Sequence, residues 1–276
     1  MDDAEGLSIA RKAVLAGGKA AFERLDDPGF HTWKRLRDPV PEGVLAVQEA
    51  VVDAIRRERP DDGILAEEGP EDEAVPVDAE NLWIVDPVCG SINFAQGIPL
   101  FAVSVALRTR GNIRAGAVFD PCRNELFEAT FEGSARMNGD VIQVQQIAEG
   151  MEVFEKSWLA ADLAPEGDLR ADSLDVFRVM AEQVTGVSMI NSPALAICWV
   201  AMGRLHAYWT LEARIWDVAA ASLILKRAGG TFTDAEGASW LHSTGGYIAS
   251  NAIIHGWTLR CIQRVRESPT RTAVDR

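Results

Sequence analysis

Three acidic positions stand where a folded chain could bring them together. Glu67 follows the short apolar run 64–66, Asp86 follows the apolar run 82–85, and Asp217 opens an apolar helical stretch. Side chains at strand ends and helix starts can converge on one crevice even when they are distant in sequence. Hard cations such as Mg²⁺ prefer carboxylate oxygens, and paired ions can activate water in phosphoryl transfer. These residue types therefore suit a metal site for phosphate chemistry.

Each of the three also has a simpler interpretation. Asp217 could cap a helix N-terminus, and Asp86 before Pro87 could initiate a turn. Glu67 and its neighbour Glu68 could be solvated loop charges. Residue types and spacing alone leave these alternatives open.

The elements that would position these residues predict an α/β protein. Apolar residues at helical spacing predict helices over 4–25, 43–58, 173–184, 193–202 and 217–228. Apolar runs separated by turn-forming residues predict an antiparallel meander over 101–107, 113–119 and 125–130. Short strands are predicted near 64–66, 82–85, 187–190, 205–210, 231–233 and 246–250. Together they indicate a layered α/β sandwich, with loop material at 26–29 and 38–41.

The weakest patterning lies at 138–170, and we place the seam between two halves there. Residues 1–145 form a predicted N-terminal α+β half carrying Glu67 and Asp86, and 146–266 a C-terminal α/β half carrying Asp217. The tail 267–276 is predicted to be disordered.

Composition and charge exclude several classes of protein. The 276 residues are 47% apolar, enough for a core, and no apolar run approaches the roughly 20 residues that span a bilayer. The net charge of −14 disfavours non-specific nucleic-acid binding. The four cysteines are far apart with no paired spacing, so their spacing suggests neither a zinc site nor a disulfide framework. The chain starts with acidic residues, so no signal peptide is indicated. We therefore expect a cytoplasmic protein with no nucleic-acid or membrane partner.

Several motifs closely resemble the inositol monophosphatase family, in order across residues 5–260. They are Ala66-Glu67-Glu68-Gly69, Trp83-Ile84-Val85-Asp86-Pro87-Val88-Cys89-Gly90-Ser91-Ile92-Asn93-Phe94, Ile215-Trp216-Asp217-Val218-Ala219-Ala220-Ala221 and Arg227-Ala228-Gly229-Gly230. The resemblance implies a five-layered αβαβα sandwich, a homodimer, and Mg²⁺-dependent hydrolysis of a small phosphorylated metabolite.

The resemblance also implies a role for each matching residue. Glu67 would bind metal, and Asp86 would bridge two ions. The backbone of Gly90 and Ser91 would receive the phosphate, because exposed N–H groups at a helix start suit an anion. The Ser91 hydroxyl would orient the attacking water. The remaining metal ligands would be the Val88 carbonyl and Asp217.

The first departure from the family is Cys89, which replaces a second aspartate. A thiol is a poor partner for Mg²⁺ and suits zinc or iron better. At its reference pKa of about 8.5 it also removes one negative charge from the pocket. We therefore expect fewer ions than usual for the family, or a softer metal at Cys89. A buried inert thiol and a nucleophile remain as alternatives.

Two further departures affect water activation and substrate choice. Val44 replaces the aspartate expected to help activate water, and a missing general base costs on the order of 10²–10⁴ in rate. Thr210 replaces the glutamate that reads inositol, and Glu212 lies on the same face of the strand but farther along. We expect Thr210, Glu212 and Asn191 to contact the substrate. Because position 210 lacks the family's inositol-binding glutamate, inositol phosphate is not the expected substrate.

Three functional hypotheses follow. The first, placed slightly ahead, is a metal-dependent phosphatase of a small phosphate monoester with reduced activity. The second is a non-hydrolytic relative that binds a phosphorylated ligand or a protein partner. The third is a catalyst repurposed for a different reaction in a specialised pathway, since a fold does not fix the activity.

Overall fold

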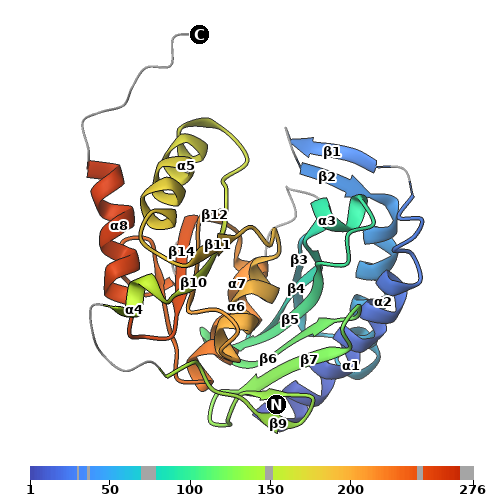
Figure 1. Ribbon diagram of the computed structural model, residues 1–276. Coiled ribbons are helices and arrows are strands. Elements are labelled where there is room, and N and C mark those ends of the chain that lie inside the picture. The colour runs from blue at the N-terminus through green and yellow to red at the C-terminus, as the bar shows by residue number, and fades with distance from the viewer. Residues whose placement is uncertain (30, 36–37, 70–78, 147–151, 241–244, 268–276) are drawn as a thin grey trace.

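The chain folds into five alternating layers of helix and sheet (Figure 1). The computed structural model describes residues 1–29, 31–35, 38–69, 79–146, 152–240 and 245–267, without the side chains of 31–40 and Glu152. A seven-stranded and a five-stranded sheet enclose one helix pair, and a further pair covers the outer face of each sheet. The predicted αβαβα sandwich is confirmed.

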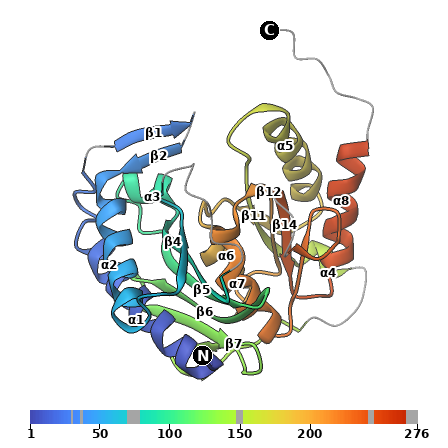
Figure 2. The same cartoon turned by 180° about the vertical axis from the view of Figure 1, so that it is seen from behind.

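The first outer layer consists of α1 (Asp3–Phe22) and α2 (Glu42–Glu58), which lie side by side in both views (Figures 1 and 2). They cover a sheet of order β3-β4-β5-β6-β7-β8-β9. Its strands are β3 (Gly63–Ala66), β4 (Asn81–Cys89), β5 (Ala102–Thr109), β6 (Asn112–Asp120), β7 (Glu125–Thr130), β8 (Arg136–Met137) and β9 (Asp140–Val141). Only the β3–β4 pairing is parallel, and the predicted meander is confirmed as β5–β6–β7.

The central layer consists of α6 (Pro193–Ala201) and α7 (Ile215–Arg227). All eight residues from Val218 to Leu225 are buried, as expected for a helix covered by a sheet on either side. Gly116 of β6 lets α7 approach closely, because a Cβ there would lie 2.9 Å from the Ala220 carbonyl oxygen. The helix that begins near Asp217 is thereby fixed against the sheet that carries Asp86.

The second sheet has the order β11-β10-β12-β14-β13. Its strands are β10 (Trp158–Asp162), β11 (Gly186–Ser188), β12 (Ala207–Ala213), β13 (Thr231–Asp234) and β14 (Gly245–Ser250). On the side away from the central helices lie α5 (Gly167–Ala181) and α8 (His255–Glu267), and α4 (Glu152–Glu155) precedes β10. Glu267, the first residue of the predicted tail, ends α8, and 268–276 lie outside the described residues.

Two local predictions were wrong. Residues 38–41 form β2 (Asp38–Pro41), which pairs with β1 (His31–Arg35). The region 138–170 contains β10, which pairs in parallel with β11 and β12, and the seam placed there stays a prediction. The strand at 82–85 does not stop before Asp86 but continues to Cys89 through an irregularity in its pairing with β5. Pro87 is tolerated there because an irregular position needs no ladder N–H.

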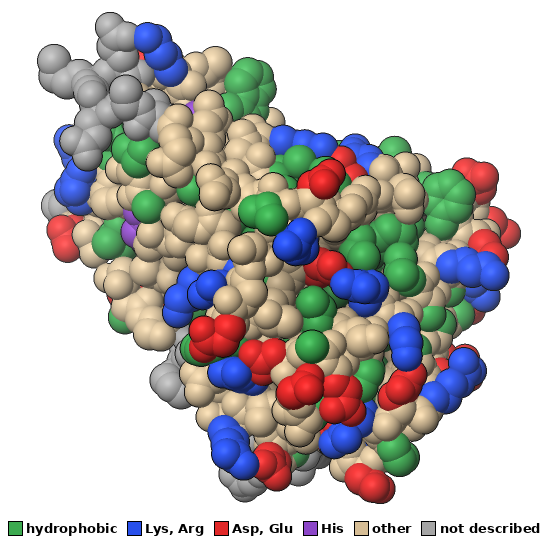
Figure 3. Space-filling view, turned by 90° about the horizontal axis from the view of Figure 1, so that it is seen from below, with side chains coloured by type: hydrophobic (Ala, Val, Ile, Leu, Met, Phe, Trp, Pro, Cys, Tyr) green, Lys and Arg blue, Asp and Glu red, His purple; other side chains and the backbone are tan. Residues whose placement is uncertain are grey.

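One face of the molecule carries its charge in mixed form. Acidic and basic side chains are interspersed on the face seen from below (Figure 3), so the net charge of −14 does not gather into one patch on that face. Among the described helices, none combines the length and apolar character that crossing a membrane requires.

Candidate metal centre

The parallel pairing of β3 and β4 brings Glu67 close to Asp86. Ala66 pairs with Val85, and the Glu67 N–H then donates to the Val85 carbonyl oxygen at 3.2 Å. Gln48 of α2 fixes the next residue, because its side-chain oxygen accepts the Glu68 N–H at 2.9 Å and its amide N–H donates to the Glu68 carbonyl. The predicted convergence of two strand ends is thus built by backbone pairing and one helix side chain.

Asp86 is fully buried, and only one of its two carboxylate oxygens accepts a hydrogen bond from a described residue. Its Oδ1 accepts the Val88 N–H at 3.1 Å, a local turn bond of the kind the simpler interpretation expected. Its Oδ2 is buried and accepts no hydrogen bond from any described residue. A buried polar atom without a partner costs free energy and needs an explanation, such as an ion that binds there.

Asp217 serves as a helix cap and also faces the acidic site. It is the third residue of α7, and its Oδ2 accepts the Arg214 N–H at 2.5 Å. Its ligand atom, one from Asp86 and the sulfur of Cys89 all lie within 4.8 Å of one another. The capping interpretation of Asp217 is therefore confirmed, and its role as a metal ligand stays a prediction that this position allows.

The electrostatics of this cluster favour a cation. Burial raises the pKa of Asp86 well above its ordinary value, and the charges of Glu67 and Asp217 raise it further. Burial likewise raises the pKa of Asp217. Acidic groups held together in a site of low polarity repel one another, and a bound divalent ion removes that repulsion.

Cys89 joins the two halves of the site. The side chain is only 2% exposed, and its sulfur accepts the Ala194 N–H at 3.3 Å at the start of α6. The Cys89 carbonyl accepts the Ser192 hydroxyl at 2.7 Å. Burial raises the pKa of the thiol well above its ordinary value, with the charges of Asp86 and Asp217 adding to the effect. That shift disfavours a nucleophilic thiolate in the absence of a cation.

The turn after β4 is fixed at the two residues predicted to receive phosphate. Gly90 has a φ of +113°, and a Cβ there would lie 2.9 Å from the Leu100 carbonyl oxygen, so glycine is required. Ser91 follows as the first residue of α3 (Ser91–Ala95) and is partly exposed. Asn93 of α3 donates to the carbonyl oxygens of Leu100 and Ile190 at 2.6 and 2.8 Å. The phosphate role of these residues stays a prediction.

Val44 lies in an apolar cluster that includes Val88 and Phe94, at the third position of α2. It is 1% exposed. The position therefore supplies packing and no oxygen for water activation.

The predicted substrate contacts differ in their surroundings. The buried Thr210 hydroxyl donates to the Glu212 carbonyl at 3.0 Å and accepts the Glu212 N–H at 3.3 Å, within an irregular part of β12. Glu212 itself is partly exposed. Asn191 has a φ of +51° and donates its N–H to Asp162 at 2.7 Å. The Thr210 hydroxyl is thus already hydrogen-bonded to the backbone of its own strand.

Asp162 is a residue that the sequence analysis missed. It ends β10, is buried, and accepts the N–H groups of Ile190 and Asn191 and the Tyr208 hydroxyl. Burial raises its pKa, and these three donors counteract the effect. The available signal was an aspartate after the apolar run 159–161, the same arrangement as at Asp86.

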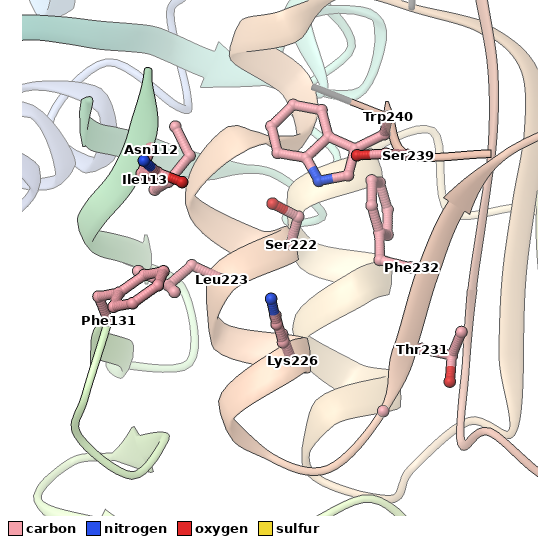
Figure 4. A pocket seen from close by; sticks show the side chains of 11 residues that line it. Asn112, Ile113, Phe131, Ser222, Leu223, Lys226, Thr231, Phe232, Ser239 and Trp240 are labelled. Atoms are coloured by element: carbon pink, nitrogen blue, oxygen red, sulfur yellow. The ribbon is translucent and has the colours of Figure 1, made fainter. Parts of the chain in front are cut away.

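A separate cavity of about 310 Å³ lies against the C-terminal half of α7 (Figure 4). Ser222, Leu223 and Lys226 of α7 line it together with Phe232 and Trp240. The acidic cluster lies at the other end of the same helix, so the cavity is not part of the metal centre.

Comparison with known proteins gives matches along nearly the whole chain. A model of the inositol monophosphatase family matches residues 2–267. The Nus factor SuhB of Pseudomonas aeruginosa is 33% identical over 252 residues, covering 89% of this chain and 91% of the relative. A Thermotoga maritima fructose-1,6-bisphosphatase/inositol-1-monophosphatase is 31% identical, covering 84% and 85%.

Solved structures agree with these matches. The extragenic suppressor protein suhB of Bartonella henselae superposes with a TM-score of 0.86 at 28% identity, covering 94% of this chain and 99% of that one. The solved suhB structure thus shares the layered fold, and the proteins similar to this chain carry different functional names.

Proposed function

Because the chain belongs to the inositol monophosphatase family, a magnesium-dependent group of phosphatases, we propose that it hydrolyses a small phosphate monoester with a bound metal ion. The observation that carries this proposal is the buried Asp86 Oδ2, which lacks a partner among the described residues. Glu67 and Asp217 supply further negative charge around it. Such a site is costly to fold empty and favourable once a cation binds.

The donor set fits a magnesium ion in part. Glu67, Asp86, Asp217 and the Val88 carbonyl offer the oxygen ligands that Mg²⁺ prefers. Cys89 does not fit, because sulfur is a soft ligand and Mg²⁺ a hard ion. We therefore propose fewer magnesium ions than the family usually binds. A bound metal ion would polarise a phosphate oxygen and lower the pKa of its water.

The chain's own groups would position the substrate. The backbone N–H groups after Gly90 would bind phosphate oxygens, and the Ser91 hydroxyl would orient the water. With valine at position 44, that position offers no carboxylate to assist the hydroxyl, which supports a reduced rate.

The proposed substrate is a small phosphorylated metabolite other than inositol phosphate. Thr210 is buried, and its hydroxyl is hydrogen-bonded to the Glu212 backbone. Position 210 therefore offers no carboxylate to bind the hydroxyl groups of a polyol. A relative named for both fructose-1,6-bisphosphate and inositol-1-phosphate supports variety of substrate within the family. We also propose a homodimer, on the family resemblance alone.

The test is phosphate release from a panel of sugar, nucleotide and polyol phosphates, with Mg²⁺, Mn²⁺ or Zn²⁺. We expect metal-dependent release by the wild type and by Lys19→Met, a control at an exposed side chain in the outer helix α1. Asp86→Asn should lose it. Silence of the wild type with every metal would contradict the proposal.

A second candidate is a non-hydrolytic binding protein. Cys89 and Val44 favour it, and a relative named a Nus factor supports a role other than catalysis in the family. It predicts that a phosphorylated compound raises the Tm of the protein without phosphate release. Measurable turnover of any phosphate ester would contradict it, and conversion without phosphate release would indicate a different reaction.

A further inference from the structure

We propose that Asp86, Cys89 and Asp217 bind one Zn²⁺ ion through two carboxylates and a thiolate. The inference rests on the proposed function and concerns one metal position of the same site. It replaces a second magnesium ion, which the family pattern would place here, by a single thiophilic one.

The first argument is the arrangement of donors. The three ligand atoms lie within 4.8 Å of one another, two of them from the end of β4 and one from the start of α7. Catalytic zinc sites use three protein ligands and leave the fourth position for water or substrate. The cluster has that number of donors, and a small inward movement would bring them to bonding distance.

The second argument is independent of the cysteine. Asp86 is fully buried, and its Oδ2 accepts no hydrogen bond from the residues that the structure describes. Its other oxygen is fixed by the Val88 N–H, which sets the direction of the carboxylate. An ion bound at Oδ2 satisfies an atom that otherwise remains desolvated.

The third argument is the chemistry of sulfur. Mg²⁺ requires nearly octahedral oxygen coordination, whereas a thiolate favours softer ions, of which zinc also accepts carboxylate oxygens. Carboxylate oxygens bind Zn²⁺ at about the same distance as they bind Mg²⁺, so Asp86 and Asp217 do not oppose the exchange. Of the three donors, Cys89 is the one that discriminates between the two metals.

The fourth argument is the support behind the sulfur. The Ala194 N–H donates to Cys89 Sγ, and the positive end of α6 adjoins it. Hydrogen bonds to a ligand orient it and tune the metal, and a helix N-terminus stabilises a thiolate. Zn²⁺ binding would therefore deprotonate a sulfur that already has a donor in place.

The experiment uses the full chain, stripped of metal, and requires no substrate. Co²⁺ titration should produce a sulfur-to-cobalt charge-transfer band that saturates at one ion per chain. Competition with a chelator in excess Mg²⁺ should show that Zn²⁺ remains bound. Cys89→Ser should abolish the band and weaken Zn²⁺ binding by at least the roughly 10–100-fold that loss of an outer-shell partner costs, because it removes a ligand itself. Cys198→Ser, which removes another buried thiol, should change neither.

Two results would overturn the inference: a wild type without the charge-transfer band, or a Cys89→Ser protein with unchanged Zn²⁺ affinity. If Cys89→Ser does not fold, zinc-edge X-ray absorption of the wild type decides, with one sulfur expected at about 2.3 Å. The readout also separates the two proposals. A sulfur-bound ion in a protein that releases no phosphate supports this inference and contradicts hydrolysis, and phosphate release without sulfur ligation does the reverse.

Discussion

Asp86 and Asp162 are buried aspartates at similar places in the two sheets. Asp86 lies near the end of β4 and Asp162 at the end of β10, each after an apolar run. Both oxygens of Asp162 are bonded, to two backbone N–H groups and a hydroxyl, at 2.7 to 3.2 Å. Asp86 has one such bond, and other acidic groups surround it. A buried carboxylate with its bonds complete stabilises the fold, whereas one left incomplete is available to a ligand.

The largest effect is expected from replacing Asp86, the aspartate whose hydrogen bonds are incomplete. Asp86→Asn should lower metal-dependent phosphate release on the order of 10³-fold, because metal assistance is worth several kcal/mol. In the metal-free protein the same substitution should not lower the free energy of unfolding, since it removes a repelled charge. Chemical denaturation with and without metal measures both. A large loss of stability in the metal-free protein would mean that Asp86 is structural.

Asp162→Ala should have the opposite profile. It leaves the Ile190 and Asn191 N–H groups and the Tyr208 hydroxyl without their acceptor, and we expect a loss of about 3 kcal/mol in unfolding free energy. Urea denaturation measures it. Zinc stoichiometry should remain at one ion per chain, and Asp162→Asn, with similar shape, should lose less. Loss of metal binding by folded Asp162→Asn would assign Asp162 to the metal centre.

A carboxylate introduced at position 44 should neither bind metal, as we propose for Asp86, nor stabilise the fold, as Asp162 does. Val44→Asp places a charge in the apolar cluster with Val88 and Phe94, and we expect a loss of about 2 kcal/mol in stability. Val44→Asn is the matched uncharged control and should lose a similar amount. A Val44→Asp protein that is stabilised by Mg²⁺ and releases phosphate faster would show instead that the side chain reaches the metal site.

The smallest expected effect sharpens the description of Asp162. Tyr208→Phe removes one hydrogen bond, at 3.0 Å, and leaves the backbone donors in place, so we expect a loss of about 1 kcal/mol. The Tm of the variant measures it. A loss as large as that of Asp162→Ala would show that the hydroxyl dominates the network.

The site around Asp86 was predicted from the sequence, whereas Asp162 was not. Glu67, Asp86 and Asp217 lie in motifs whose residues and order along the chain indicated a shared site. Asp162 was missed because its strand is short and rich in alanine, which has weak strand propensity. β2 was missed because prolines stand in it and usually mark loops.

The contact that fixes Cys89 could not be predicted from the sequence. Its sulfur meets the Ala194 N–H across 105 residues, and such a contact depends on how the central helices pack between the sheets. The sequence showed that an aspartate was missing, but not that the sulfur would lie among the remaining carboxylates.

The central claim is that Asp86, Cys89 and Asp217 form one metal site, and anomalous diffraction tests it most directly. Crystals grown with Zn²⁺ and measured across the zinc absorption edge should show a peak about 2.3 Å from Cys89 Sγ and about 2.0–2.2 Å from oxygens of Asp86 and Asp217. A peak bound by Asp86 and Glu67 without the sulfur, or no peak at this position, would contradict the account.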